Sequence, residues 1–139
     1  MKKLAILSAF VLVLSHSLAA QAQPPAQKAK FIPPVKGVAT VEVIQLPSKR
    51  VGSEMVTNLK VRNTSKGSIN LLKVDEYWYD VNKQIVMNSQ YAHRKAPIQP
   101  DEVIEITLKS PYSAKMRQDQ LIFTHANGKI DAKSVKAFK

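Results

Sequence analysis

Acidic residues gather in one short stretch of the sequence, DEYWYD at positions 75–80. On an extended strand Asp75 would point to one face, and Glu76 and Asp80 to the other. Two carboxylates on one face could share a hard cation such as calcium if a loop supplied carbonyl oxygens. Since no loop has the ligand spacing of a calcium site, we favour an Asp80 that caps a turn and a Glu76 that pairs with a nearby lysine.

Two histidines, His93 and His125, follow residue 22. A zinc site would need both rings and a carboxylate, and their spacing does not demand one. The sequence has no cysteine, no G-x-S-x-G elbow and no glycine-rich phosphate loop. We therefore expect no metal, no cofactor and no enzymatic activity. A small metal-dependent ligand binder or enzyme, built on the two histidines and acidic loops, is kept as an alternative.

The aromatic residues of the same stretch are candidates for binding rather than catalysis. Trp78 shares a face with Leu72 and Val74, which places it in the core. Tyr77 and Tyr79 take the opposite face. If that face is exposed, two tyrosines two residues apart form a contact patch of the kind enriched at interfaces. Burial under segment 112–118, or cross-strand packing, is the alternative.

Positive charge dominates the composition. The chain has 21 Lys and Arg against 10 Asp and Glu, and without Lys2 and Lys3 the formal charge is +9. Such a surface attracts polyanions, and Arg94 and Lys95 are candidate partner-binding residues within its basic run His93-Arg94-Lys95. We expect an envelope protein or an anionic envelope polymer as partner. Nucleic acid is disfavoured because no basic helix or basic aromatic platform is present.

The first 22 residues have the pattern of a secretory signal peptide. Met1-Lys2-Lys3 is positive, residues 4–14 are apolar, and Ala20-Gln21-Ala22 is a small-x-small cleavage site. Cleavage is expected after Ala22 or Ala20. The apolar run is shorter than the roughly 18 residues of a lasting anchor. The sequence predicts an exported protein, periplasmic or secreted, without a transmembrane anchor after cleavage; an uncleaved anchor is the alternative.

The rest of the chain divides into a proline-rich flexible leader at 23–36 and one β-domain at 37–139. Alternating apolar and polar residues predict about seven strands, with a helical turn at 113–119 as the one exception. Asn127-Gly128 predicts a hairpin in which both central residues have positive φ. The strand count and spacing indicate an all-β fold, an immunoglobulin-like antiparallel β-sandwich, with a small barrel as the alternative. The expected strands are 39–47, 55–62, 69–81, 85–91, 103–109, 121–125 and 129–138.

Several short motifs between residues 61 and 106 resemble the FxLYD family, an immunoglobulin-like module of exported and envelope proteins. They are VRNTS at 61–65, WYD at 78–80, NKQ at 82–84 and IQPDE at 98–102. The resemblance implies a binding or accessory role without catalytic residues. The sequence departs from the family pattern at Glu76, where the family has Phe, and at Lys83 and Asp101, where it has turn glycines. A structural subunit that associates by edge-strand pairing is a further alternative.

Overall fold

The structure, a computed structural model, describes residues 30–139. The expected signal peptide at 1–22 and the first part of the expected leader at 23–36 lie outside these residues. The compact unit spans Phe31–Lys139. Pro34 forms a parallel bridge with Ser68, and the Val35 N–H donates to the Ser68 carbonyl at 2.8 Å. The last residues of the expected leader therefore contact the domain.

Within residues 30–139 the protein is all-β, which confirms the predicted class. Eight strands are present, and no helix of this part is long and apolar enough to cross a membrane. The strands are β1 (Ala39–Gln45), β2 (Lys49–Val51), β3 (Glu54–Asn63), β4 (Lys73–Tyr79), β5 (Ile85–Ala92), β6 (Val103–Pro111), β7 (Gln118–His125) and β8 (Gly128–Ser134).

Two local predictions need correction. The turn expected at 49–53 is confined to Gly52 and Ser53, because Lys49, Arg50 and Val51 form β2 and pair with the start of β3. Segment 113–119, expected as a helical turn, makes a single bend closed by the Met116 N–H on the Ser113 carbonyl (3.1 Å) and then enters β7.

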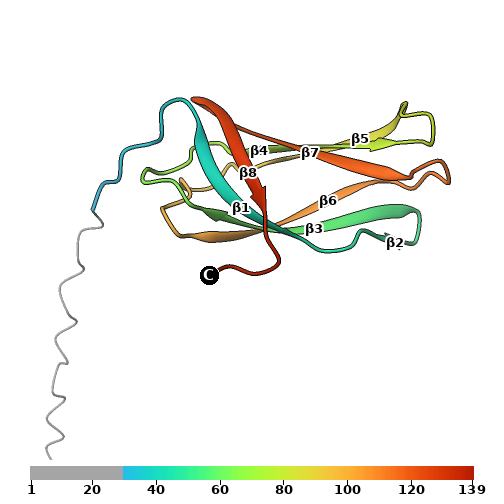
Figure 1. Cartoon of the computed structure of the whole chain (residues 1–139), viewed down its shortest axis with the longest axis horizontal. Helices are drawn as coiled ribbons and strands as arrows, with labels where there is room; N and C mark the ends of the chain where they lie inside the picture. The colour runs from blue at the N-terminus through green and yellow to red at the C-terminus, as the bar shows by residue number, and fades with distance from the viewer. Residues whose placement is uncertain (1–29) are drawn as a thin grey trace, which may run out of the picture. The chain divides into compact units, whose positions relative to one another are not determined.

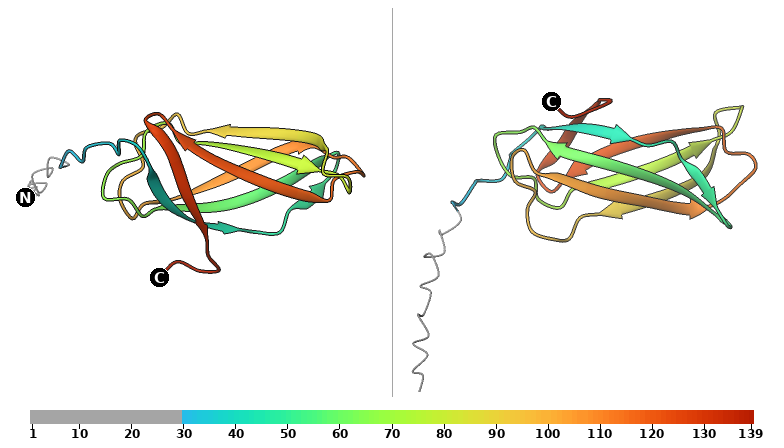
Figure 2. Two further views of the ribbon diagram at one scale, coloured as in Figure 1. Left: turned by 45° about the horizontal axis from the view of Figure 1, so that its top comes forward. Right: turned by 90° about the horizontal axis from the view of Figure 1, so that it is seen from below.

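The strands form one mixed sheet that curls into a half-barrel with two facing halves (Figures 1 and 2). One half contains β5, β4 and β7, with β4 in the centre. The other contains β6, β3 and β1. β2 pairs with the start of β3, and β1 pairs with the second half of β3 along the same edge. β8 joins the halves: it leaves a hairpin with β7 and runs parallel to β1. Because β1 and β8 are parallel, the sheet is not the purely antiparallel sandwich that was predicted.

Alternation along the strands builds one core between the halves. The side chains of β4 alternate strictly between half-buried and buried from Lys73 to Tyr79. Trp78 is 6% exposed, as predicted. β4 is shorter than the expected strand 69–81, because Leu71 has a φ of 50° and interrupts the extended chain. The core residues are Ala39, Val41, Val43, Leu59, Val61, Ile69, Leu72, Val74, Ile98, Ile106, Leu108 and Phe123.

Asp80 caps the β4–β5 hairpin, as predicted. Its Oδ1 accepts the N–H groups of Asn82 (2.8 Å) and Gln84 (2.9 Å). Lys83 closes this turn with a φ of 59°, the left-handed position of a three-residue hairpin loop. Asp101 has a φ of 65° as the third residue of the turn 99–102. Both residues therefore occupy backbone positions that favour glycine.

The hairpin predicted around Asn127-Gly128 is present, but its geometry differs from the prediction. His125 pairs with Gly128, so the central residues are Ala126 and Asn127, and neither has positive φ. Gly128 itself has a positive φ of 152°, as predicted for the second residue of the motif, and a Cβ there would also clash with the Gly37 carbonyl oxygen.

Candidate functional site

The outer surface of β5, β4 and β7 carries two tyrosines surrounded by amides. Strand register places Tyr77 between Asn88 and Gln120, and Tyr79 opposite Gln118. Both tyrosines are half-buried, and the amide residues are exposed. As predicted, the tyrosines share the face opposite Trp78. We call the outward set Tyr77, Tyr79, Asn88, Gln90, Gln118 and Gln120 the tyrosine–amide face.

Hydrogen bonds hold part of this face in place. The Tyr79 hydroxyl donates to Gln120 Oε1 at 3.0 Å. Gln90 Nε2 donates to Asp75 Oδ1 at 2.7 Å, and Lys73 Nζ lies 3.2 Å from Asp75 Oδ2. Since amides both donate and accept, the face can satisfy polar groups of either kind on a ligand.

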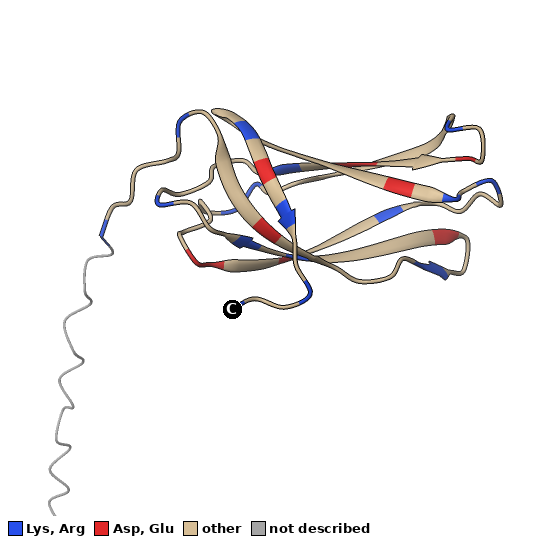
Figure 3. Cartoon of the chain, viewed as in Figure 1, with Lys and Arg blue, Asp and Glu red and all other residues tan. Residues whose placement is uncertain are grey.

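The face carries little net charge although the protein is strongly basic. β5 has no charged residue, and the outward positions of β4 hold only the paired Lys73 and Asp75 (Figure 3). Depletion of charge together with tyrosine enrichment is typical of the centre of a protein interface. The arrangement is suited to binding, and it brings no nucleophile next to a base.

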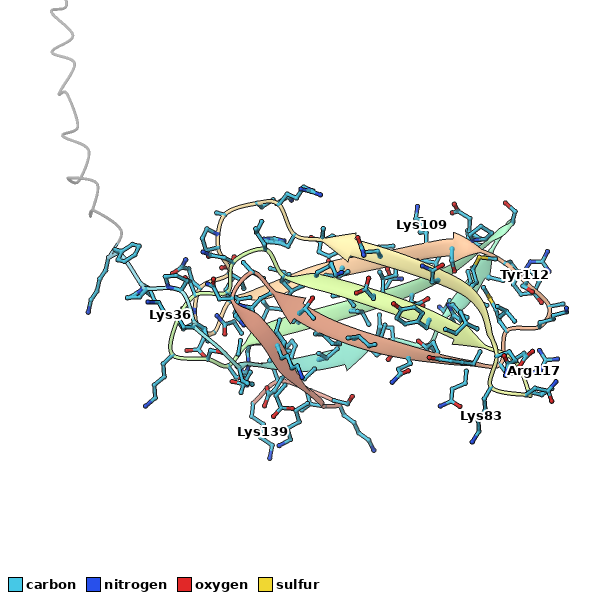
Figure 4. All side chains as sticks on the ribbon, turned by 90° about the horizontal axis from the view of Figure 1, so that it is seen from above. Lys36, Lys83, Lys109, Tyr112, Arg117 and Lys139 are labelled. Carbon is cyan, nitrogen blue, oxygen red and sulfur yellow. The ribbon has the colours of Figure 1, made fainter. Side chains whose placement is uncertain are left out.

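A shallow hollow of about 450 Å³ continues the face toward the β4–β5 hairpin. Tyr79, Gln118 and Gln120 form one side, and Asp80 and Lys83 form the rim. A second hollow of about 330 Å³ lies beyond Asp80 and is lined by Arg117. Lys83 and Arg117 lie at the same end of the domain (Figure 4). The face therefore ends in a polar recess with two positive side chains nearby.

The structure does not bring all four predicted binding residues together. Arg94 and Lys95 are exposed and follow the end of β5 at Ala92, which pairs with Lys73 at the start of β4. Tyr79 lies at the other end of β4, six residues away, or roughly 20 Å along an extended strand. The basic run and the tyrosines therefore belong to opposite ends of the same half-barrel.

Glu76 lies in the core, contrary to the predicted lysine pair. Its side chain is fully buried and accepts a short hydrogen bond from Trp78 Nε1. The Thr57 hydroxyl lies close to the carboxyl and shares a hydrogen bond with the Ser48 hydroxyl at 2.7 Å. Glu76 Oε2 has no hydrogen-bond partner within residues 30–139. A lysine could reach the carboxyl only by bringing a second charge into the core.

Burial raises the pKa of Glu76 above its ordinary value of 4.5. The neighbouring Thr57 hydroxyl and the hydrogen bond from Trp78 lower the pKa, and the nearby Asp119 carboxylate raises it further. Asp119 itself accepts Gln45 Nε2 at 2.7 Å across the two halves. A protonated Glu76 is thus the form that the interior favours.

The two histidines are buried and lie on either side of Leu72. The His93 N–H donates to the Leu72 carbonyl, and the β4–β7 register, continued by one residue, places His125 on the other side. Two strand spacings separate them, roughly 10 Å. Among the residues that the structure describes, no three metal-ligating side chains form a group.

Both imidazoles are committed to hydrogen bonds with the backbone. His93 Nε2 faces the Ala96 carbonyl at 3.2 Å, and His125 Nε2 faces the Gly37 carbonyl at 2.7 Å. Because a carbonyl only accepts, each Nε2 carries the proton. The Asn127 N–H donates to His125 Nδ1, and His93 Nδ1 shares a hydrogen bond with the Tyr91 hydroxyl at 3.0 Å. The rings act as structural links between loops.

Sequence reasoning missed the amides that complete the tyrosine–amide face. A signal was present, because Asn88 and Gln90 on β5, and Gln118 and Gln120 on β7, alternate with apolar or inward residues. Which strands flank β4 was the missing information, since pairing with β7 joins segments about forty residues apart in the sequence.

No protein-family model matches the chain, and no curated protein matches it. A solved structure described as "Structural characterization of IrmA from Escherichia coli" is similar in part. It has a TM-score of 0.44 and 9% sequence identity, and the match covers 68% of this chain and 91% of that one. A likeness this distant carries no inference about function.

Proposed function

We propose that this protein is an exported, non-enzymatic binding or accessory module of the cell envelope that recognises a partner protein through the tyrosine–amide face. The single observation that carries the proposal is a charge-poor surface with two half-buried tyrosines on a chain of net charge +11. Interface centres are enriched in tyrosine and depleted in charge in this way.

We also propose that the domain is an immunoglobulin-like sandwich of the FxLYD family. Two features support it. The two facing halves enclose one core, as in a sandwich. Lys83 and Asp101, at the positions of the family's turn glycines, both have left-handed backbone. The sequence motifs remain the main basis of this assignment, and the fold alone does not fix a function.

A second contact surface is proposed at the opposite end, where Arg94 and Lys95 are exposed. Two adjacent cations on a basic protein favour an anionic polymer over a neutral one. Retention on an anionic polysaccharide column should fall for an Arg94→Ala, Lys95→Ala variant and remain unchanged for variants in the tyrosine–amide face. Equal retention of the wild type and the Arg94→Ala, Lys95→Ala variant would contradict this second surface.

The principal test is a Tyr77→Ala, Tyr79→Ala double variant. We expect it to lose its crosslinked partner in the native envelope and to keep a cooperative melting transition, because both rings are on the outer face. Tyr112→Ala is a matched control: Tyr112 is also half-buried, but it packs under Arg50, 4.0 Å from its ring centroid, away from the face. If the double variant keeps the same partner, or Tyr112→Ala loses it equally, the proposed face is wrong.

A further inference from the structure

Strands β7 and β8 separate almost as soon as their hairpin begins. They pair at two positions only, Thr124 with Lys129 and His125 with Gly128. β8 then follows β1, while β7 remains beside β4 (Figures 1 and 2). Within residues 30–139, segment 118–123 of β7 therefore has a strand partner on one side only. Its other edge is open over six residues, on the order of 20 Å.

The gap between the two strands is hollow and partly apolar. It encloses about 450 Å³ and is lined by Leu121 and Phe123 from β7 and by Ile130 and Ala132 from β8. Phe123 belongs to the core, and Leu121 and Ile130 pack against it. The half-barrel is thus open at this gap, where its core reaches the surface beside an unpaired strand edge.

Two other edges of the sheet, those of β2 and β8, have features by which proteins prevent unwanted pairing, whereas the outer edge of β5 is uncharged and lies beside β6. β2 has three residues and carries Lys49 and Arg50. β8 carries Lys129, Asp131 and Lys133. These two edges are short or charged.

β7 lacks such protection along its open edge. Segment 120–123, QLIF, contains no charge and no proline, and its pairing with β4 has no bulge. The one acidic residue of β7, Asp119, precedes this segment and accepts a hydrogen bond from Gln45 Nε2. An uncharged edge of this kind is a template for another strand.

We propose that the gap between β7 and β8 is an acceptor site for one extended segment of a partner protein, which pairs with β7 and fills the half-barrel. The acceptor site uses the backbone edge of β7 and does not require binding at the tyrosine–amide face, although Gln118 and Gln120 belong to both surfaces. The backbone edge of β7 provides hydrogen bonds, and the pocket of Leu121, Phe123 and Ile130 accepts alternate side chains of the segment.

A second copy of this chain fits the gap poorly. A segment between β7 and β8 needs both of its edges free, whereas β7 of a second copy already uses one edge to pair with β4. Two basic copies also repel each other. The chain's own segment 23–30 is equally unsuitable, because Pro24 and Pro25 lack the N–H groups that a ladder requires.

The site defines the chemistry of its segment. Inward positions should be apolar to contact Leu121 and Phe123, and prolines should be absent. Lys129 lines the gap, and Lys133 follows Asp131 on β8, so this strand has one excess positive charge that acidic residues at outward positions complement. The expected partner therefore presents a strand in which apolar residues alternate with polar and acidic ones.

Amide hydrogen exchange by NMR tests the proposal on the purified protein. The probe is a capped peptide of about nine residues in which valine alternates with threonine and glutamate. We expect alternate amides of segment 118–123 to exchange rapidly in the free protein and at least about tenfold more slowly with about 1 mM peptide. A peptide with a central proline should give no protection.

Ile122→Asp is the diagnostic variant, because it places a negative charge on the open edge. Its matched control is Val103→Asp on β6; the two residues are 42% and 44% exposed. The first variant should lose peptide protection and the second keep it, with both retaining their strand circular dichroism.

Four results would overturn the proposal. They are no protection by the acidic peptide, equal protection by the proline peptide, protection without peptide that rises with protein concentration, and protection without peptide at any concentration. The third would assign the edge to a second copy, and the fourth to the chain itself.

Discussion

Replacing Glu76 by glutamine tests whether a carboxyl group in the core sets the pH dependence of stability. Glu76→Gln keeps the shape of the side chain and an oxygen that accepts the Trp78 Nε1 proton. It removes the group whose ionisation the interior opposes. The amide nitrogen would take the place of Oε2, which has no partner in the wild type either. The substitution therefore changes ionisation and little else.

The direction in which the free energy of unfolding changes with pH follows from proton linkage. Burial raises the pKa of Glu76 in the folded state, while the unfolded chain keeps a value near 4.5. Above pH 4.5 the unfolded chain releases a proton that the folded chain retains, so the free energy of unfolding falls as pH rises, until the folded group also ionises. Each tenfold decrease in the acid dissociation constant of Glu76 on folding lowers the free energy of unfolding by about 1.4 kcal/mol once the folded group is ionised. Glu76→Gln should equal the wild type near pH 4 and exceed its stability by that amount near pH 8.

Urea unfolding between pH 4 and pH 8 measures this difference. Trp78 is the single tryptophan of the chain and lies against the substituted group, so its fluorescence reports the transition. Glu105→Gln is the control for the loss of an acidic group, because the Glu105 side chain is 78% exposed; it should not reproduce the gain in stability near pH 8. The reasoning is refuted if the Glu76→Gln difference is constant with pH or becomes unfavourable at pH 8.

Three further substitutions test the turns. Gly128→Ala should lower the free energy of unfolding by about 1–3 kcal/mol, because its Cβ would meet the Gly37 carbonyl; thermal unfolding measures the loss. Asp101→Gly should raise the free energy of unfolding by up to about 1 kcal/mol, because it relieves a left-handed φ of 65°; an unchanged or lower urea midpoint would argue against backbone strain there. Asn63→Ala should cost about 3 kcal/mol in denaturant unfolding, because the buried amide bonds to Gly67, Ile98 and Ser65; a loss below about 1 kcal/mol would show that water replaces these bonds.

Local patterns predicted the features that depend on neighbouring residues. The period of two along residues 73–79 placed Trp78 inside and the tyrosines outside. Asp80 was predicted to cap its turn because the aspartate side chain bonds to backbone two residues ahead, a purely local interaction.

Features that depend on distant segments were not predictable in this way. Glu76 is buried because Thr57 and Asp119, from two other strands, surround it, and no local rule places a carboxyl group in a core. Gly128 was predicted for its positive φ, which it has, but its close approach to Gly37, about ninety residues earlier, was not predictable. The open edge of β7 follows from β8 pairing with β1, which no short motif encodes.

The parallel pair of β1 and β8 also constrains how the protein folds. Ala39 pairs with Ile130 and Val43 with Ser134, so one of the first strands made waits for the last one. A chain that leaves a ribosome or crosses a membrane from its N-terminus cannot complete this pair until nearly all of it has emerged. Contacts of such long sequence separation slow folding. The sheet therefore cannot close before β8 is available, and until then the chain can still pass through a narrow channel.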